Sequence, residues 1–303
     1  MRALACPASL KGVLTAGEAA SALARGLRQG GAEAEELPLA DGGEGTAVVL
    51  GAEVVRVERV HDAFGRERES PVRALADGTV VVESAEAIPF DPSRLDVRAA
   101  SSRGLGELIA RAGPCERLLV CLGGTATMDA GAGLLEALPE LPAATTTVLC
   151  DTRATLAEAP WLFGPQKGAT AGEVAELGRR FATLPLADLP GGGAAGGLGA
   201  ALASLGAELV PGAAYVLEAK AFRDRAAAAD FVVTGEGAVD RTTFEGKAPG
   251  EAVRACAELG VRCVLFGGRV EDGLEAVALT GDPARAREDL QELGVSLATA
   301  DSN

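Results

Sequence analysis

Histidine is almost absent from this chain. His61 is the only one in 303 residues, and it lies in a polar segment, 61–65, that is typical of a turn. A Ser-His-Asp triad needs a histidine as its base, and a histidine-ligated zinc site needs several. Both kinds of site are therefore effectively excluded, and any proton transfer must fall to carboxylates or lysines.

Paired cysteines are also missing. None of the six cysteines is spaced C-x-x-C, and four of them lie within or beside apolar runs, where free cysteines commonly pack as small hydrophobic residues. We therefore expect reduced core cysteines, as in a cytoplasmic protein. The six are Cys6, Cys115, Cys121, Cys150, Cys256 and Cys263.

Long apolar runs are lacking as well. No run of about 18 apolar residues occurs, and the opening segment 1–7 is too short an apolar stretch for a signal peptide. We expect a cytoplasmic protein that has no membrane partner.

Positive charge is scarce. The chain has 28 Lys and Arg against 43 Asp and Glu, a net charge of −15, so a broad nucleic-acid-binding surface is not expected. Only four lysines occur, and three of them lie in glycine-bearing turns, which favours a role in binding a local anion. For any one of them taken alone, a solvated surface lysine is the better explanation. The four are Lys11, Lys167, Lys220 and Lys247.

The order of the expected elements indicates an α/β fold. A strand at 3–6 precedes a helix opened by the capping box of Thr15 and Glu18, and another strand follows at 35–39. Turn-rich β-segments between 54 and 85 indicate antiparallel ribbons. Strands at 231–234 and 261–266, with weaker ones near Ala276 and Ser296, return to the pattern of a parallel α/β unit.

Length and composition agree with two globular domains, since 48% of the residues are hydrophobic and 23% charged. We predict a flavodoxin- or Rossmann-like parallel-sheet domain made of residues 1–51 and 205–303. A second, mixed α/β domain of residues 52–204 is inserted into it. Ligands of open α/β sheets bind outside the carboxyl ends of the strands, so we expect the site in the cleft between the domains.

The segment 235–249 is the most informative loop. It follows the apolar run 231–234 and combines glycines with Glu236, Asp240 and Lys247. Glycines let backbone N–H groups approach a ligand, so the segment suits phosphate and metal. A plain strand-to-helix loop with solvated charges explains it equally well.

Two further glycine-rich stretches are less specific. The loop 123–133 offers exposed N–H groups, hydroxyls and a carboxylate for an anion, but close helix–strand packing also explains its glycines. It lacks the G-K-[ST] ending of a P-loop, and the stretch 191–199 has no clear strand before it, as a dinucleotide fingerprint would require.

Taken together, these segments resemble the type I glycerate kinase family from one end of the chain to the other. Eight of them occur in the family's order, which is far more specific than any one alone. They are Ser9–Gly12, Ala40–Thr46, Gly104–Leu108, Leu122–Thr127, Cys150–Asp151, Phe163–Ala169, Gly193–Ala200 and Gly235–Pro249.

The resemblance implies an ATP- and Mg²⁺-dependent kinase of D-glycerate or a similar hydroxy acid, with 2-phosphoglycerate the favoured product. It implies catalytic roles for Lys11, Asp151, Lys167 and Asp240, and magnesium binding by Asp41 and Glu44. Catalysis of this kind is mainly positioning and charge neutralisation, so it needs no histidine. The residues expected to bind substrate or phosphate are Ser9, Gly123, Gly124, Thr125, Gly235, Gly237 and Lys247.

Several positions depart from the family pattern and remove polar groups that would position substrate. They support an alternative: a catalytically impaired paralogue that binds a small acid or nucleotide as a regulatory protein, or a kinase for another hydroxy acid. The departures are Ala8 for Asp, Met128 for Asn, Ala238 for Arg, Thr242 for Gln, and a shortened segment at 152–156.

Overall fold

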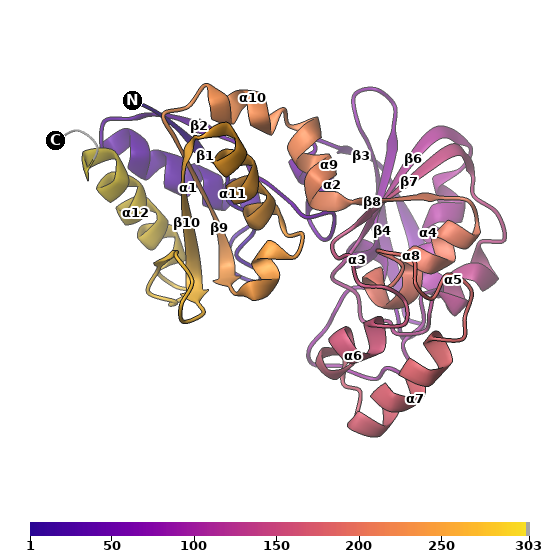
Figure 1. Ribbon diagram of the computed structural model, residues 1–303. Helices are drawn as coiled ribbons and strands as arrows, with labels where there is room; N and C mark the ends of the chain where they lie inside the picture. Colours follow the sequence, from indigo (N-terminus) through magenta and orange to yellow (C-terminus); the bar gives the residue numbers. More distant parts are fainter. Residues whose placement is uncertain (301–303) are drawn as a thin grey trace. The chain divides into compact units, whose positions relative to one another are not determined.

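The structure, a computed structural model, describes residues 1–300 and contains two compact units (Figure 1). The first unit consists of Met1–Asp41 and the chain from Ala213 onward, and the second of Gly42–Gly212. The predicted α/β class is confirmed, with one all-parallel and one mixed sheet. Compactness does not test independent folding, so the domains 1–51 with 205–303, and 52–204, stay a prediction.

The first unit is built on a five-stranded parallel sheet in the order β11-β10-β9-β1-β2. Its central pair, β1 and β9, joins segments more than two hundred residues apart in the chain. The strands are β1 (Arg2–Ala5), β2 (Glu33–Glu36), β9 (Phe231–Val239), β10 (Arg262–Val270) and β11 (Val277–Ala278).

Helices cover both faces of this sheet, because alternate strand residues point to opposite sides. Ala3 and Ala5 pack with α1 (Ala16–Gln29) and α12 (Ala286–Ala300), which lie side by side in Figure 1. Leu4 and Cys6 pack on the other face. The helices there are α9 (Gly212–Ala219), α10 (Phe222–Ala227) and α11 (Ala248–Leu259).

Local capping sets where α1 begins. Thr15 accepts a hydrogen bond from Glu18 N at 3.2 Å, and the Glu18 carboxylate accepts one from Thr15 N at 2.9 Å. These bonds satisfy N–H groups that the first helical turn leaves unpaired. The predicted capping box is therefore confirmed.

The second unit contains a six-stranded sheet in the order β3-β4-β5-β6-β7-β8. The β3, β4 and β5 strands pair antiparallel, as the sequence predicts, and β5 to β8 pair parallel. The strands are β3 (Glu53–His61), β4 (Glu67–Ala74), β5 (Val80–Glu83), β6 (Cys115–Leu122), β7 (Ala143–Cys150) and β8 (Glu208–Pro211).

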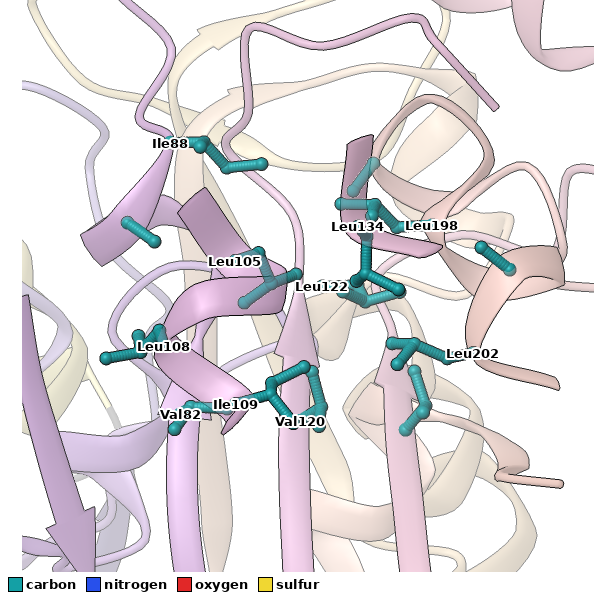
Figure 2. Packing of buried hydrophobic residues seen from close by; sticks show 14 of the residues in the cluster. Val82, Ile88, Leu105, Leu108, Ile109, Val120, Leu122, Leu134, Leu198 and Leu202 are labelled. Atoms are coloured by element: carbon teal, nitrogen blue, oxygen red, sulfur yellow. The ribbon is translucent and has the colours of Figure 1, made fainter. Parts of the chain in front are cut away.

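The core of the second unit lies where α4 (Arg103–Ala112) packs on this sheet (Figure 2). Leu105, Leu108 and Ile109 of α4 are fully buried with Val82 and Val120 of the strands. Such burial is the main driving force for folding. The remaining helices of the unit are α2 (Thr46–Val49), α3 (Ser84–Ala87), α5 (Ala132–Ala137), α6 (Ala159–Phe163), η1 (Pro165–Lys167), α7 (Ala171–Phe181) and α8 (Ala194–Ser204).

Two sequence expectations about the first unit are wrong. The β9 strand continues through Gly235 to Val239, where the sequence predicts a turn, because its parallel pairing with β10 extends to Val270. A Cβ at Gly235 would collide with the carbonyl of Phe266, so this glycine serves the close pairing of the strands. The strand expected near Ser296 is part of α12, which packs on α1 through Leu290 and Leu293.

No helix within residues 1–300 is both long and apolar enough to cross a bilayer.

The crossing of α1 and α12 depends on a glycine. A Cβ at Gly26 would collide with the backbone carbonyl of Gln291, so we predict that Gly26→Ala lowers the free energy of unfolding by about 1–3 kcal/mol. Gly17, in the same helix, has no such neighbour, and Gly17→Ala should raise stability by up to about 1 kcal/mol. Denaturant titration of both variants measures the difference; equal stability would contradict this packing.

Candidate active site

A cavity of about 500 Å³ lies in the first unit, at the carboxyl ends of the parallel strands. We call it the first-unit pocket. Its wall comes from segments after β1, β2 and β11, from the ends of β9 and β10, and from the start of α12. The lining residues are Ser9, Leu10, Lys11, Val13, Asp41, Glu236, Gly237, Ala238, Asp240, Lys247, Gly268, Arg269, Leu279, Gly281, Asp282, Pro283, Ala286 and Asp289.

The pairing of β1 with β9 positions the part of the wall that follows β1. Ala8 N donates to Gly235 O at 2.9 Å, which extends the β1–β9 register beyond β1. The chain then makes a tight turn, in which Leu10 bridges Leu14 and Gly12 has a φ of +74°. This turn holds Lys11 at the pocket.

A charged network occupies the β9 side of the pocket. Lys247 Nζ lies 3.5 Å from each carboxylate oxygen of Glu236 and 4.0 Å from Asp240 Oδ1. Thr243 Oγ1 donates to Glu236 at 2.8 Å. Burial raises the pKa of the Glu236 carboxyl, while Lys247 and Thr243 oppose that rise. The effect of burial on Glu236 is therefore opposed by the ammonium group of Lys247, which is held beside it.

Asp240 has a structural task of its own. It caps the short helix η2 (Arg241–Phe244), accepting hydrogen bonds from both the hydroxyl and the backbone N–H of Thr242. The Thr242 hydroxyl is the main cause that lowers the pKa of Asp240. Its oxygen Oδ1 is thus already committed to the loop.

A second polar cluster lies in the second unit, at the carboxyl ends of the parallel neighbours β6 and β7. Gly123, Gly124 and Thr125 follow β6, and Asp151 follows β7. A Cβ at Gly123 would lie 2.5 Å from Asp151 Oδ2, so only glycine lets the carboxylate approach this backbone. We call these four residues and Lys167 the second-unit cluster.

Lys167 is the buried cation of this cluster. Its side-chain nitrogen donates to Thr127 O at 2.8 Å and lies 3.5 Å from Thr125 Oγ1, and the residue is 5% exposed. Burial lowers the pKa of the Lys167 ammonium to about 8, although the charges of Asp151 and Asp129 raise it. An amine with this pKa is still mainly charged at neutral pH.

Asp129 and Glu44 lie near this cluster in different roles. Asp129 accepts hydrogen bonds from the Ser102 hydroxyl at 2.8 Å and from Gly131 N at 3.1 Å, so it braces its loop. Glu44 lies against Gly124, where a Cβ would come 3.3 Å from Glu44 Oε2.

The structure thus groups the predicted residues into two sets and leaves one outside. Gly235 does not line the first-unit pocket; it serves the pairing of β9 with β10. The roles assigned to all of these residues, Gly235 included, stay predictions. The first-unit pocket contains Ser9, Lys11, Asp41, Gly237, Asp240 and Lys247, and the second unit holds Glu44, Gly123, Gly124, Thr125, Asp151 and Lys167.

Four charged pocket residues lie outside the predicted set: Glu236, Arg269, Asp282 and Asp289. The sequence places Glu236 in its loop without giving it a role. Arg269 follows Gly267 and Gly268, and charge after a glycine-rich strand end is a usable signal. Nothing in the sequence around Asp282 distinguishes it from an exposed turn residue.

The departures from the family pattern are accommodated differently. Met128 is fully buried in an apolar cluster with Phe181 and Leu156. This position is therefore part of the core, and methionine there does not remove a polar group from a polar loop. At the end of the shortened segment, the Thr155 hydroxyl and N–H each donate to the Glu158 carboxylate at 2.9 Å. Ala238, by contrast, lines the first-unit pocket.

The carboxylates fit magnesium that arrives with a nucleotide. Within residues 1–300, no group of three or more His, Cys, Asp or Glu side chains is placed to hold a metal ion. Mg²⁺ usually keeps several waters and takes one or two carboxylates together with substrate phosphates. Asp41 lies in the first-unit pocket, and its charge adds to the raised pKa of Glu236; its role as a magnesium ligand stays a prediction.

A parallel sheet with a charged pocket at its carboxyl ends is typical of α/β enzymes that bind phosphorylated ligands. The family model described as "Glycerate kinase family" matches residues 3–140 and 139–284. The chain belongs to the glycerate kinase family. Membership of a kinase family implies the use of ATP.

Individual relatives agree with this assignment. The chain is 33% identical to a glycerate kinase of Bacillus subtilis, over 91% of this chain and 87% of the relative. It is 32% identical to the glycerate 2-kinase of Escherichia coli K12, over 82% and 80%. A crystal structure described as a "putative glycerate kinase 2" from Salmonella typhimurium LT2 superposes with a TM-score of 0.77 at 28% identity, covering 100% and 98%.

The buried state of Lys167 can be measured directly, because the chain has only four lysines. In protein labelled with ¹³C at lysine Cε, we predict that one NMR signal titrates with a midpoint of about 8 and disappears in Lys167→Met. Asp151→Asn should lower that midpoint, since the Asp151 charge favours the ammonium form.

The lowered pKa of Lys167 also makes the stability of the fold depend on pH. An unfolded lysine has a pKa of about 10.4, so the unfolded state binds more protons between about pH 8 and 10.4, and this residue makes stability rise with pH there. If no lysine signal that is lost in Lys167→Met titrates near pH 8, the burial described here is wrong.

Proposed function

We propose that this protein transfers the γ-phosphoryl group of ATP to the 2-hydroxyl of D-glycerate and releases 2-phosphoglycerate. The family membership supports glycerate as acceptor, and the relative named glycerate 2-kinase favours the 2-phosphate. The structural observation that carries the proposal is the second-unit cluster, where a buried ammonium group and a carboxylate lie at the ends of adjacent strands.

This cluster suits a small hydroxy acid. The Lys167 ammonium can pair with the carboxylate of glycerate, and Thr125 adds a hydroxyl beside it. Asp151 is our candidate for the group that orients the attacking hydroxyl and accepts its proton. Asp240 is the weaker candidate, because Thr242 already occupies one of its oxygens.

The positive groups of the first-unit pocket suit the transferred phosphoryl group. Phosphoryl transfer depends on positioning and on neutralising charge that spreads over the phosphate oxygens. Lys11 and Lys247 would supply that positive charge. Bound Mg²⁺ would neutralise phosphate charge as well, and Asp41 and Glu44 are the carboxylates that we propose to hold it.

A second candidate function follows from Ala238. This alanine lines the first-unit pocket at a position where the related sequences are expected to carry arginine. A missing guanidinium would weaken the hold on a phosphate more than on the small acid, because arginine matches phosphate in a bidentate way. An impaired paralogue that binds its ligand without turning it over would have this pattern.

We predict that the purified protein releases ADP from MgATP only when D-glycerate is present. Coupling with enolase identifies the product, because enolase acts on 2-phosphoglycerate directly. Asp151→Asn should lower kcat about a hundredfold or more, as expected for loss of a general base. Asp188→Asn, an exposed change of the same kind in the same unit, should have no effect.

Absence of ADP release above the Asp151→Asn background, with glycerate and several other small hydroxy acids, would reject the kinase proposal.

Restoring the missing groups gives a separate prediction. Ala8→Asp combined with Ala238→Arg should raise kcat/KM about tenfold, which corresponds to one additional charge-assisted hydrogen bond. Ala227→Arg, an exposed helix position of the first unit, adds the same charge as a control. Equal kcat/KM in all these proteins would show that the two losses do not limit turnover.

A further inference from the structure

We infer that the first-unit pocket is the nucleotide site, with the phosphates at the ends of β1 and β9 and the base against an apolar wall next to α12. This inference rests on the proposed function, because it assigns one of the two substrates of that reaction to a pocket. Four properties of the pocket carry it: strand topology, charge, apolar lining and size.

The sheet reverses its winding between β1 and β9. From β1 the chain passes through α1 to β2, on one side of this pair, and from β9 through α11 to β10, on the other. The two helices lie on opposite faces of the sheet, since α1 packs with Ala3 and Ala5 and α11 packs with Leu4 and Cys6. Loops at such a reversal separate and leave a crevice that holds nucleotides in open α/β sheets.

The phosphate end is the part of the pocket nearest this reversal. Lys11 follows β1, and Lys247 is held by Glu236 at the first turn of α11. A helix start adds partial positive charge to the same place. Gly237 and Gly268 line the wall without side chains, and a Cβ at Gly268 would lie 2.8 Å from Gly237 O of the paired strand. Together these features suit a chain of phosphates.

The other end of the pocket is apolar. Leu10, Leu279 and Ala286 belong to one hydrophobic cluster, the one that α1 and α12 share, and Pro283 and the half-exposed Val13 adjoin them in the lining. Leu279 is fixed by its N–H, which donates to Gly267 O at 2.8 Å. A flat aromatic base can bury its faces on such a wall.

The volume of the pocket favours the nucleotide over glycerate as its ligand. A cavity of about 500 Å³ lies within the range that binds drug-sized ligands, which matches a nucleotide and far exceeds a three-carbon acid. Three of its carboxylates accept hydrogen bonds from neighbouring hydroxyls: Asp289 from Thr280, Asp240 from Thr242 and Glu236 from Thr243. An acidic wall suits a ligand that brings a divalent cation with its phosphates.

The test is MgADP binding to the full chain by calorimetry, without glycerate. Two substitutions of opposite charge at Ala238 should have opposite effects. Ala238→Arg should tighten MgADP binding about fivefold, and Ala238→Glu should weaken it by a similar factor. Lys11→Ala should weaken it as well. Arg25→Ala, an exposed change in α1, is the matched control and should leave the affinity unchanged.

The position of the base is tested by photolabelling with 8-azido-ATP. Tryptic cleavage after Arg269 and Arg285 releases the peptide 270–285, which contains Leu279, Asp282 and Pro283. We expect the label in this peptide and its loss when excess MgADP competes. Label found only in peptides of the second unit would overturn the assignment.

The outcomes separate this inference from the proposed function. If MgADP binds and responds to Ala238 and Lys11 while no hydroxy acid is phosphorylated, the nucleotide site stands and the kinase proposal fails. If glycerate is phosphorylated but the pocket variants change only the KM for glycerate, the pocket binds the acid and this inference fails. Wild-type protein that binds no MgADP also overturns it. Circular dichroism confirms that each variant is folded.

Discussion

The parallel pairing of β1 with β9 is the constraint on which the first unit depends. It places Ala3 beside Phe231 and extends past β1 through the hydrogen bond from Ala8 N to Gly235 O. The pairing closes a long chain loop at an entropic cost that grows only slowly with loop length. Burial on both faces of the sheet offsets that cost, and the reversal of winding at this pair leaves the pocket at its carboxyl edge.

The two polar sites both have glycines at their strand ends but differ in solvation. A Cβ at Gly123 would exclude the Asp151 carboxylate, whereas a Cβ at Gly268 would exclude the backbone of the paired strand β9. The first-unit pocket keeps Lys247 partly solvated against Glu236. The second-unit cluster buries Lys167 almost completely, so that its charge depends on Asp151 and Asp129. A buried cation interacts strongly with a small anion because little water screens it.

Local signals in the sequence were sufficient where the interaction itself is local. Thr15 and Glu18 predict the start of α1 because both partners of the cap lie in one turn. Gly235 looked like a turn because glycine disfavours strands, but pairing with Phe266 decided otherwise. The task of Asp129 was equally hidden, since its partner Ser102 is 27 residues away and only tertiary structure joins them. The family's motifs identified pocket residues such as Lys11, Asp240 and Lys247, while Asp282 required the fold itself.

The central claim is transfer of phosphate to the 2-hydroxyl of D-glycerate, and ³¹P NMR of the reaction tests it most directly. The account predicts that the γ-phosphate signal of ATP declines while a phosphomonoester doublet grows, because phosphorus on carbon 2 couples to a single proton. A triplet would place the phosphate on carbon 3 and contradict the assigned hydroxyl. An unchanged γ-phosphate signal, or growth of inorganic phosphate alone, would contradict the kinase activity itself.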